Sequence, residues 1–202
     1  MEDAIQADFP APLLALLSDA PARDFAVGAT LIDAAEPAPP VWYIESGLVR
    51  LYALDADGHG YNLGFHVGGE LVSGRLVLGT DRVCCVDRAL AVEALQPTRA
   101  RALSLAELDR LRRHDGEVAS WLIDRLLRLN AERLGRETDL VQRSATERYA
   151  ELTRKHPAIV DKLPLHQIAA WLGITPVALS RIRRRTRKPG AGEGKGSPEQ
   201  LT

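Results

Sequence analysis

Apolar and polar residues alternate over short stretches between positions 25 and 103, which is the pattern of antiparallel strands. Short strands are predicted at 41–44, 48–54, 59–65, 89–95 and 99–103. Turn residues separate several of them, at Ser46-Gly47, Asp57-Gly58 and Gln96-Pro97. A short helix is expected before them, at 11–17. Closely spaced short strands favour a small antiparallel roll or barrel over a parallel sheet.

The spacing of apolar residues becomes helical after the last strand. Ser104 and Glu107 form a capping-box signature, so a helix is predicted to start there. From Asp115 to about Arg154 the sequence contains no proline and predicts one long helix. One apolar stripe can cover the roll and consists of Trp121, Leu122, Leu126 and Leu129. The second has heptad-like steps and consists of Ile123, Leu127, Asn130, Leu134 and Val141.

The second stripe has no obvious partner within the chain. A heptad-like seam is typical of paired helices, so we favour a homodimer through residues 115–143, in which Asn130 sets the register. The alternative is that both stripes pack inside one chain.

Residues 163–188 predict two short helices joined by a tight turn. Pro164 suits the start of the first helix, and Gly173 ends it. Thr175 suits the N-cap of the second helix, and Pro176 suits its first residue. This outline is a helix-turn-helix whose second helix can enter a DNA major groove. The alternative is a packed helical corner with a solvated basic face.

The distribution of charge favours DNA binding. The chain has a net charge of −1, but residues 144–188 carry ten Lys and Arg against three Asp and Glu, whereas residues 1–143 carry fifteen against twenty-two. A basic second helix suits the phosphate backbone of double-stranded DNA. The predicted DNA-contacting residues are Thr175, Pro176, Val177, Ser180, Arg181, Arg184, Arg185 and Arg187.

Composition limits the other classes of protein. At 202 residues and 46% apolar content, the chain can form one large domain or two small ones. It has no apolar run long enough for a bilayer and no signal-peptide pattern, which predicts a cytoplasmic protein without a membrane partner. Cys84 and Cys85 cannot by themselves hold an iron–sulfur cluster or a structural zinc, so no metal site is predicted. A redox-sensing thiol stays an alternative.

The order of roll, long helix and helix-turn-helix resembles the Crp/Fnr superfamily of bacterial transcription regulators. The resemblance rests on the segments YIESGLVRLYALDADGHGYNLGF, GGELV, ERYAEL and LPLHQIAAWLGITPVALSRIRR. It implies an α+β fold with an N-terminal antiparallel β-roll, like a cyclic-nucleotide-binding domain, at 1–114. The roll is followed by a dimerisation helix at 115–143 and then by a helix-turn-helix domain at 144–188 with little or no wing. The tail at 189–202 is rich in Gly, Pro and charge, and is predicted to be disordered.

The resemblance also implies a function. It predicts a dimeric regulator that reads a pseudo-palindromic operator with the helix at 176–187 and responds to a signal at the β-roll. RNA polymerase is a further candidate partner. The family often has a Glu in the recognition helix that reads a cytosine amino group, but Val177 stands there and suits a thymine methyl instead. Arg181 keeps its basic place and suits guanine.

The same resemblance places an effector pocket at Gly69, Glu70, Leu71, Arg88 and Ala89. Members that bind cyclic AMP have a Glu for the ribose hydroxyl, and that position falls near Gly74. They also hold the cyclic phosphate with an Arg followed by Ser or Thr, whereas Arg88 is followed by Ala89, which lacks a hydroxyl donor. Cyclic AMP is therefore not the expected effector, and the cofactor is left unassigned. The alternative for Arg88 is a surface strand residue.

Two other classes of protein are less consistent with the sequence. A metal-dependent enzyme of the cupin type needs clustered His and carboxylate ligands. His59 and His66 are isolated in the sequence, so the chain is not predicted to be an enzyme. Haem ligation by His59, His66 or His114 stays open. So does a ligand-sensing or protein-interaction module without specific DNA binding, although the charge distribution disfavours it.

Overall fold

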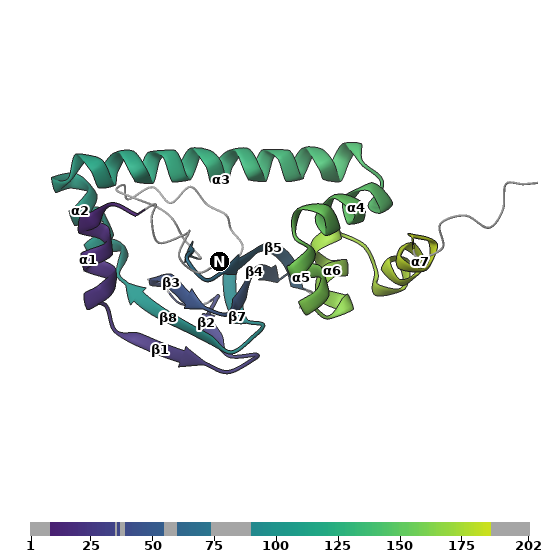
Figure 1. The fold of residues 1–202 in the computed structure, drawn as a ribbon, viewed down its shortest axis with the longest axis horizontal. Helices are drawn as coiled ribbons and strands as arrows, with labels where there is room; N and C mark the ends of the chain where they lie inside the picture. The colour runs from purple at the N-terminus through teal and green to yellow at the C-terminus, as the bar shows by residue number, and fades with distance from the viewer. Residues whose placement is uncertain (1–8, 35, 37–38, 55–59, 74–89, 187–202) are drawn as a thin grey trace, which may run out of the picture. The chain divides into compact units, whose positions relative to one another are not determined.

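A computed structural model describes residues 9–34, 36, 39–54, 60–73 and 90–186 of the chain (Figure 1). The chain divides into two compact units, residues 1–143 and residues 144–202. We call them the N-terminal unit and the C-terminal unit. None of the described helices is long and apolar enough to cross a membrane.

The N-terminal unit contains two antiparallel four-stranded sheets. The strand order in the first is β1 (Ala22–Phe25), β8 (Thr98–Leu103), β3 (Val41–Ser46) and β6 (Leu71–Val72). The order in the second is β2 (Thr30–Ile32), β7 (Leu90–Ala94), β4 (Leu48–Leu54) and β5 (Gly60–Val67). The predicted α+β fold with an antiparallel roll is confirmed. Strands β1, β2 and β6 were not predicted, because each has only two to four residues and too little alternation to detect.

The turn between β3 and β4 shows why glycine is needed in this roll. Gly47 has a φ of 107°, and a Cβ atom there would lie 2.7 Å from the carbonyl oxygen of Pro97. No other residue fits that space or readily adopts that conformation. The predicted turns at Ser46-Gly47 and Gln96-Pro97 therefore pack against each other, whereas Asp57-Gly58 lies outside the described residues.

Two clusters of buried side chains form the core of the N-terminal unit. One lies on the two sheets and includes Trp42, Ile44 and Val92. The other joins the first sheet to three helices, which are α1 (Ala11–Asp19), α2 (Leu105–His114) and α3 (Gly116–Gln142). Only Val118 and Leu122 of α3 are buried, so its first two turns anchor it in this core.

The prediction of one helix from Asp115 to Arg154 is wrong. Helix α3 ends at Gln142, and α4 (Ala145–Lys155) begins after a break. The carboxylate of Glu147 accepts a hydrogen bond from the backbone N–H of Ser144 at 2.8 Å, and Ser144 Oγ accepts one from the N–H of Glu147 at 3.3 Å. This capping box starts a new helix. The box predicted at Ser104, at the start of α2, is confirmed.

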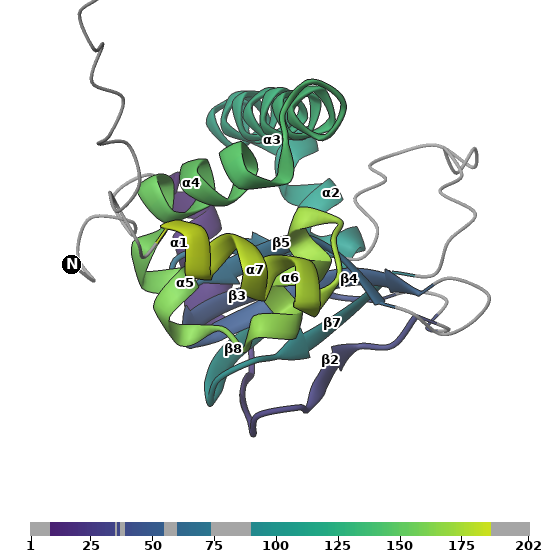
Figure 2. The same cartoon turned by 90° about the vertical axis from the view of Figure 1, so that its right-hand side faces the viewer.

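The described part of the C-terminal unit is helical. Helix α4 is followed by α5 (Pro157–Lys162), α6 (Leu165–Leu172) and α7 (Pro176–Thr186). Helices α6 and α7 contact each other, and Figure 2 shows them side by side. Each has a buried apolar side, with Ile168 and Leu172 on α6 and Leu179 and Ile182 on α7. These two helices are the predicted helix-turn-helix.

Candidate nucleic-acid interface

The turn between α6 and α7 has the geometry that its sequence predicts. Gly173 follows α6 in the left-handed conformation, with φ 65° and ψ 35°. The N–H of Ile174 donates to the carbonyl of Ala169 at 3.0 Å, so a carbonyl near the end of α6 gains a hydrogen-bond partner. Thr175 Oγ1 accepts from the N–H of Ala178 at 3.2 Å, as an N-cap does. The turn thus orients α7 through local hydrogen bonds.

Helix α7 presents a continuous polar and basic face to solvent. Leu179 is fully buried and marks the inner side of the helix. The residues at helical steps of three and four on the outer side are all exposed, and they are Val177, Ser180, Arg181 and Arg184. Val177 is 63% exposed, which leaves its methyl groups available to a partner. Four of the predicted DNA-contacting residues therefore share one face.

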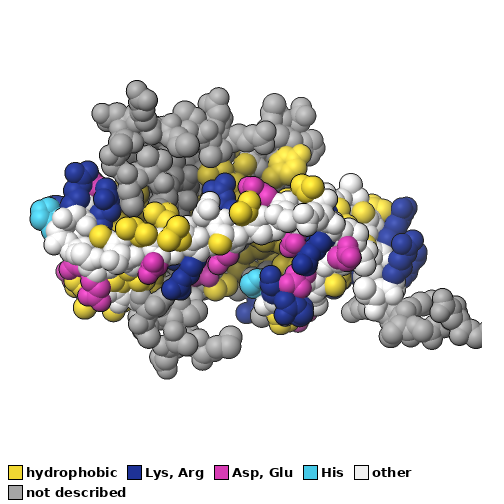
Figure 3. Space-filling model, turned by 90° about the horizontal axis from the view of Figure 1, so that it is seen from above, with side chains coloured by type: hydrophobic (Ala, Val, Ile, Leu, Met, Phe, Trp, Pro, Cys, Tyr) yellow, Lys and Arg dark blue, Asp and Glu magenta, His cyan; other side chains and the backbone are white. Residues whose placement is uncertain are grey.

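Among the residues that the structure describes, no carboxylate pairs with the cations of this face. Arg181, Arg184 and Arg185 are exposed, and in the described part of the chain none of them forms an ion pair. By contrast, Arg154 on α4 pairs with Glu151, and hydrogen bonds from Arg154 and Lys155 lower the pKa of that carboxyl to about 2. Figure 3 shows Lys and Arg side chains gathered at the α7 end of the C-terminal unit. Arg187 lies outside the described residues.

A long-range contact holds α4 against the helix-turn-helix. Arg148 Nη2 donates a hydrogen bond to the carbonyl of Leu172 at 2.9 Å. That carbonyl belongs to the last turn of α6, where backbone acceptors lack partners within the helix. Arg148 therefore both completes α6 and connects it to α4. The sequence did not suggest this role, because Arg148 precedes Leu172 by 24 positions.

The second apolar stripe of α3 is exposed along the helix. Ile123 is 58% exposed, Leu127 62%, Leu134 60% and Val141 87%, and Asn130 on the same stripe is also exposed. Figure 3 shows a row of hydrophobic side chains along this helix. The stripe expected to cover the roll does so only in part, because Leu122 is buried but Leu126 is 38% exposed. An apolar row of this length on a solvated helix indicates a binding surface.

A second contact attaches the far half of α3 to the roll. Arg136 Nη2 donates to the carbonyl of Asn62 at 2.8 Å, and its Nη1 donates to the carbonyl of Leu63 at 3.3 Å. The register of β4 and β5 shifts at this place, so that Leu63 has no partner residue on β4. Such a bulge leaves backbone groups unpaired in the ladder. Burial lowers the pKa of the Arg136 guanidinium, while Glu137 opposes that shift.

The predicted effector pocket is described only in part. Gly69, with a φ of 90°, donates its N–H to the carbonyl of Ile44 at 2.8 Å, and Leu71 begins β6. The carboxylate of Glu70 lies 2.9 Å from His66 Nδ1, so both side chains have a partner within the roll. The remaining residues of interest lie outside the described part, and they are His59, Gly74, Cys84, Cys85, Arg88 and Ala89.

Comparisons with known proteins support the fold. The sequence matches no family model and no curated protein. Its structure resembles FixK2 from Bradyrhizobium japonicum, with a TM-score of 0.66, 22% identity, and coverage of 83% of this chain and 84% of that one. A regulator of the crp/fnr family from Eubacterium rectale gives a TM-score of 0.67 at 14% identity, covering 92% and 87%.

The c-di-GMP responsive global regulator CLP from Xanthomonas campestris also gives a TM-score of 0.67, at 16% identity and coverage of 87% and 90%. Identities this low establish a shared fold rather than a shared activity. The three similarities cover between 83% and 92% of this chain. The chain therefore has the fold of Crp/Fnr regulators over most of its length.

Proposed function

We propose that this protein is a DNA-binding transcription regulator of the Crp/Fnr type. The observation that carries the proposal is the outer face of α7, where Arg181, Arg184 and Arg185 are exposed and have no carboxylate partner among the described residues. A helix with this face, supported on its inner side by Leu179 and preceded by a tight turn, suits a DNA major groove. Arg181 is the candidate for reading guanine, and Val177 the candidate for a thymine methyl.

A dimer through α3 completes the proposal. The stripe of Ile123, Leu127, Asn130, Leu134 and Val141 supplies an apolar seam for the same helix of a second copy. Two copies related by a two-fold axis carry two recognition helices. They then read half-sites about one helical turn apart, which makes the operator a pseudo-palindrome. This arrangement distinguishes the regulator from a ligand-sensing module that does not bind DNA specifically.

Substitutions on α7 test the DNA-binding proposal. Duplexes selected from a random pool by the parent protein are expected to contain a pseudo-palindrome. Arg181→Ala should weaken binding to the selected duplex by about 1–3 kcal/mol and relax the base preference at one position of each half-site. Arg184→Ala should weaken all duplexes evenly and reduce the salt slope by about one. Gel shifts over a series of salt concentrations measure both effects.

Arg154→Ala is the matched control, because Arg154 is exposed in the same unit but already pairs with Glu151. It should bind DNA as the parent does. If the parent selects no sequence, or if the α7 variants and the control bind alike, α7 does not enter the groove and the proposal is wrong.

The β-roll is expected not to bind cyclic AMP tightly. By the family resemblance, Gly74 removes the acceptor for the ribose hydroxyl and Ala89 removes a donor to the phosphate. Each ligand group left unpaired in a buried pocket costs about 1–3 kcal/mol, so affinity should fall by roughly two decades or more. Calorimetry measures this directly. Binding at micromolar concentration or tighter that disappears in Arg88→Ala would contradict the expectation.

A further inference from the structure

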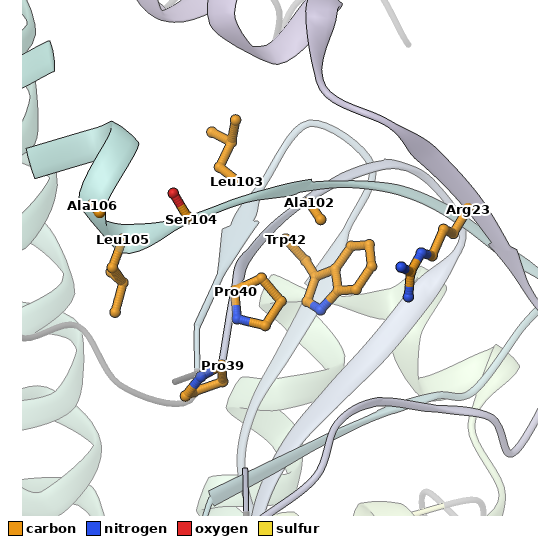
Figure 4. Close-up of a pocket in the computed structure, with 9 residues that line it drawn as sticks. All are labelled: Arg23, Pro39, Pro40, Trp42, Ala102, Leu103, Ser104, Leu105 and Ala106. Carbon is orange, nitrogen blue, oxygen red and sulfur yellow. The ribbon is translucent and has the colours of Figure 1, made fainter. Parts of the chain in front are cut away.

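A cavity of about 440 Å³ opens on the N-terminal unit beside the first sheet (Figure 4). Its volume lies within the range of small-molecule sites, which is roughly 300–1,000 Å³. It is bordered by the start of β3, the end of β8 and the first turn of α2. None of its lining residues belongs to the predicted effector pocket, and none lies on α3 or in the C-terminal unit.

The walls of the cavity are mostly apolar. Trp42 is only 2% exposed and its indole closes the floor of the cavity, with Pro39 and Pro40 on one side and Leu105 of α2 nearby. The indole of Trp42 is held firmly, because its Nε1 donates to the carbonyl of Leu31 at 2.9 Å and its ring packs edge-on against Phe25 at 5.1 Å. A rigid aromatic base flanked by prolines is pre-organised, so a ligand needs to order little of the protein.

The space exists because a small residue stands between two large ones. In the first sheet β8 lies between β1 and β3, and Ala102 of β8 pairs directly with Trp42 of β3. Arg23 of β1 reaches across this position, so that its guanidinium carbon lies 5.9 Å from the centre of the Trp42 ring. A larger side chain at Ala102 would fill the gap that Arg23 spans.

Arg23 is the cation of this cavity. Its side chain is exposed, and in the described part of the chain it forms no ion pair, in contrast to Arg99 and Arg101 on β8, which pair with Glu45. Figure 4 shows its guanidinium at one end of the cavity, beyond the indole of Trp42. An Arg over an aromatic face can still donate two parallel hydrogen bonds to a planar anion.

The start of α2 does not serve as a second anion site. Its capping position is occupied, because the carboxylate of Glu107 accepts hydrogen bonds from the N–H of Ser104 at 2.9 Å and from Ser104 Oγ at 2.7 Å. These bonds lower the pKa of Glu107, which places a negative charge in the first turn of α2, next to the lining residues Ser104, Leu105 and Ala106. The cavity is therefore positive at Arg23 and apolar at Pro40 and Leu105, and the negative charge of Glu107 lies beside its α2 end.

We propose that this cavity binds a small, flat carboxylate, whose apolar body packs against Pro40 and Leu105 above the buried ring of Trp42 and whose carboxylate pairs with Arg23. A single guanidinium matches one carboxylate, whereas the apolar walls and Glu107 disfavour a nucleotide with several phosphate charges. The inference does not rest on DNA binding. It assigns a ligand site at the junction of the roll and α2, which is followed directly by α3.

The test uses 2-naphthoate as the probe and 2-naphthamide as its uncharged match, added to the full-length protein. Naphthoate should bind with one site per chain and a Kd of about 0.1–1 mM, as expected for a ligand of this size. Naphthamide should bind about fivefold more weakly, because the ion pair with an exposed Arg is lost. Arg23→Gln should remove this preference and Arg23→Lys should keep most of it. Arg110→Gln, an exposed Arg of α2 outside the cavity, is the control and should change nothing.

The location is read from the three indole N–H signals in a ¹H–¹⁵N spectrum, assigned with Trp121→Phe and Trp171→Phe. The signal of Trp42 should shift on titration and the other two should not. The proposal is overturned if naphthoate does not bind, if Arg23→Gln leaves its preference over naphthamide intact, or if Trp121 or Trp171 shifts instead. Tighter binding of an N-acetylated apolar peptide with a free C-terminus would also overturn it, in favour of a protein partner.

Discussion

The double substitution Leu127→Glu/Leu134→Glu is expected to convert a dimer into monomers. Both side chains are about 60% exposed in the single chain, at 62% and 60%, and lie two helical turns apart on one stripe of α3. In a two-fold dimer each copy loses two leucines from the seam. The dimer thus loses four leucines, and at about 1.5 kcal/mol for each one association becomes less favourable by roughly 6 kcal/mol, which raises the Kd by about four decades. Repulsion between carboxylates adds to this loss.

Sedimentation or light scattering at micromolar concentration measures the change, and the gel shift should lose its tight complex with the selected duplex. The control is Glu132→Lys, which alters charge on the opposite side of α3 by helical spacing and should leave the dimer intact. A parent protein that is already monomeric at this concentration would show that the exposed stripe has another partner. The stability of the monomer, followed by circular dichroism, should not change, because neither leucine is part of the core.

The fold was predictable wherever a signal is contained within one element. Strands β3, β4 and β8 alternate or run apolar over six or seven residues, long enough to stand out from their surroundings. The two residues of β6 become a strand only because β3 lies beside them, and no local pattern records that pairing. The break after Gln142 is different, because the capping box of Ser144 and Glu147 was present in the sequence. The uninterrupted helical spacing on both sides concealed it.

The candidate DNA interface was predictable for the same reason. The turn at Gly173, the cap at Thr175 and the basic face of α7 all depend on residues within a few positions of one another. The groups that support this face and the roll were not predictable. Arg148 and Arg136 donate to carbonyls 24 and 74 positions away, and an exposed-looking Arg in a helical pattern gives no sign of such a contact. The cavity at Arg23 depends likewise on the pairing of three strands.

Arg136→Met is expected to destabilise the attachment of α3 to the roll. Arg136 links the second half of α3 to the edge strand β5, where it donates to the carbonyls of Asn62 and Leu63 at the bulge. Methionine keeps most of the length and apolar contact of the side chain but donates no hydrogen bond. The partly buried carbonyl of Asn62 then loses a charged donor, which costs about 1–3 kcal/mol, whereas the exposed carbonyl of Leu63 can bond water instead.

Hydrogen exchange resolves this loss by position. The amides of β5 and of the second half of α3 should exchange faster in Arg136→Met, whereas those of β3 and β8, which lie in the other sheet, should keep their protection. Arg133→Met is the control, because Arg133 is exposed on the same helix one turn earlier. The amides of this variant should exchange at the same rates as those of the parent. Arg136→Lys retains a donor, so its exchange rates should lie between those of the parent and those of Arg136→Met. Equal exchange in Arg136→Met and Arg133→Met would mean that α3 is held by Val118 and Leu122 alone, so that its remaining turns depend on a partner for their position.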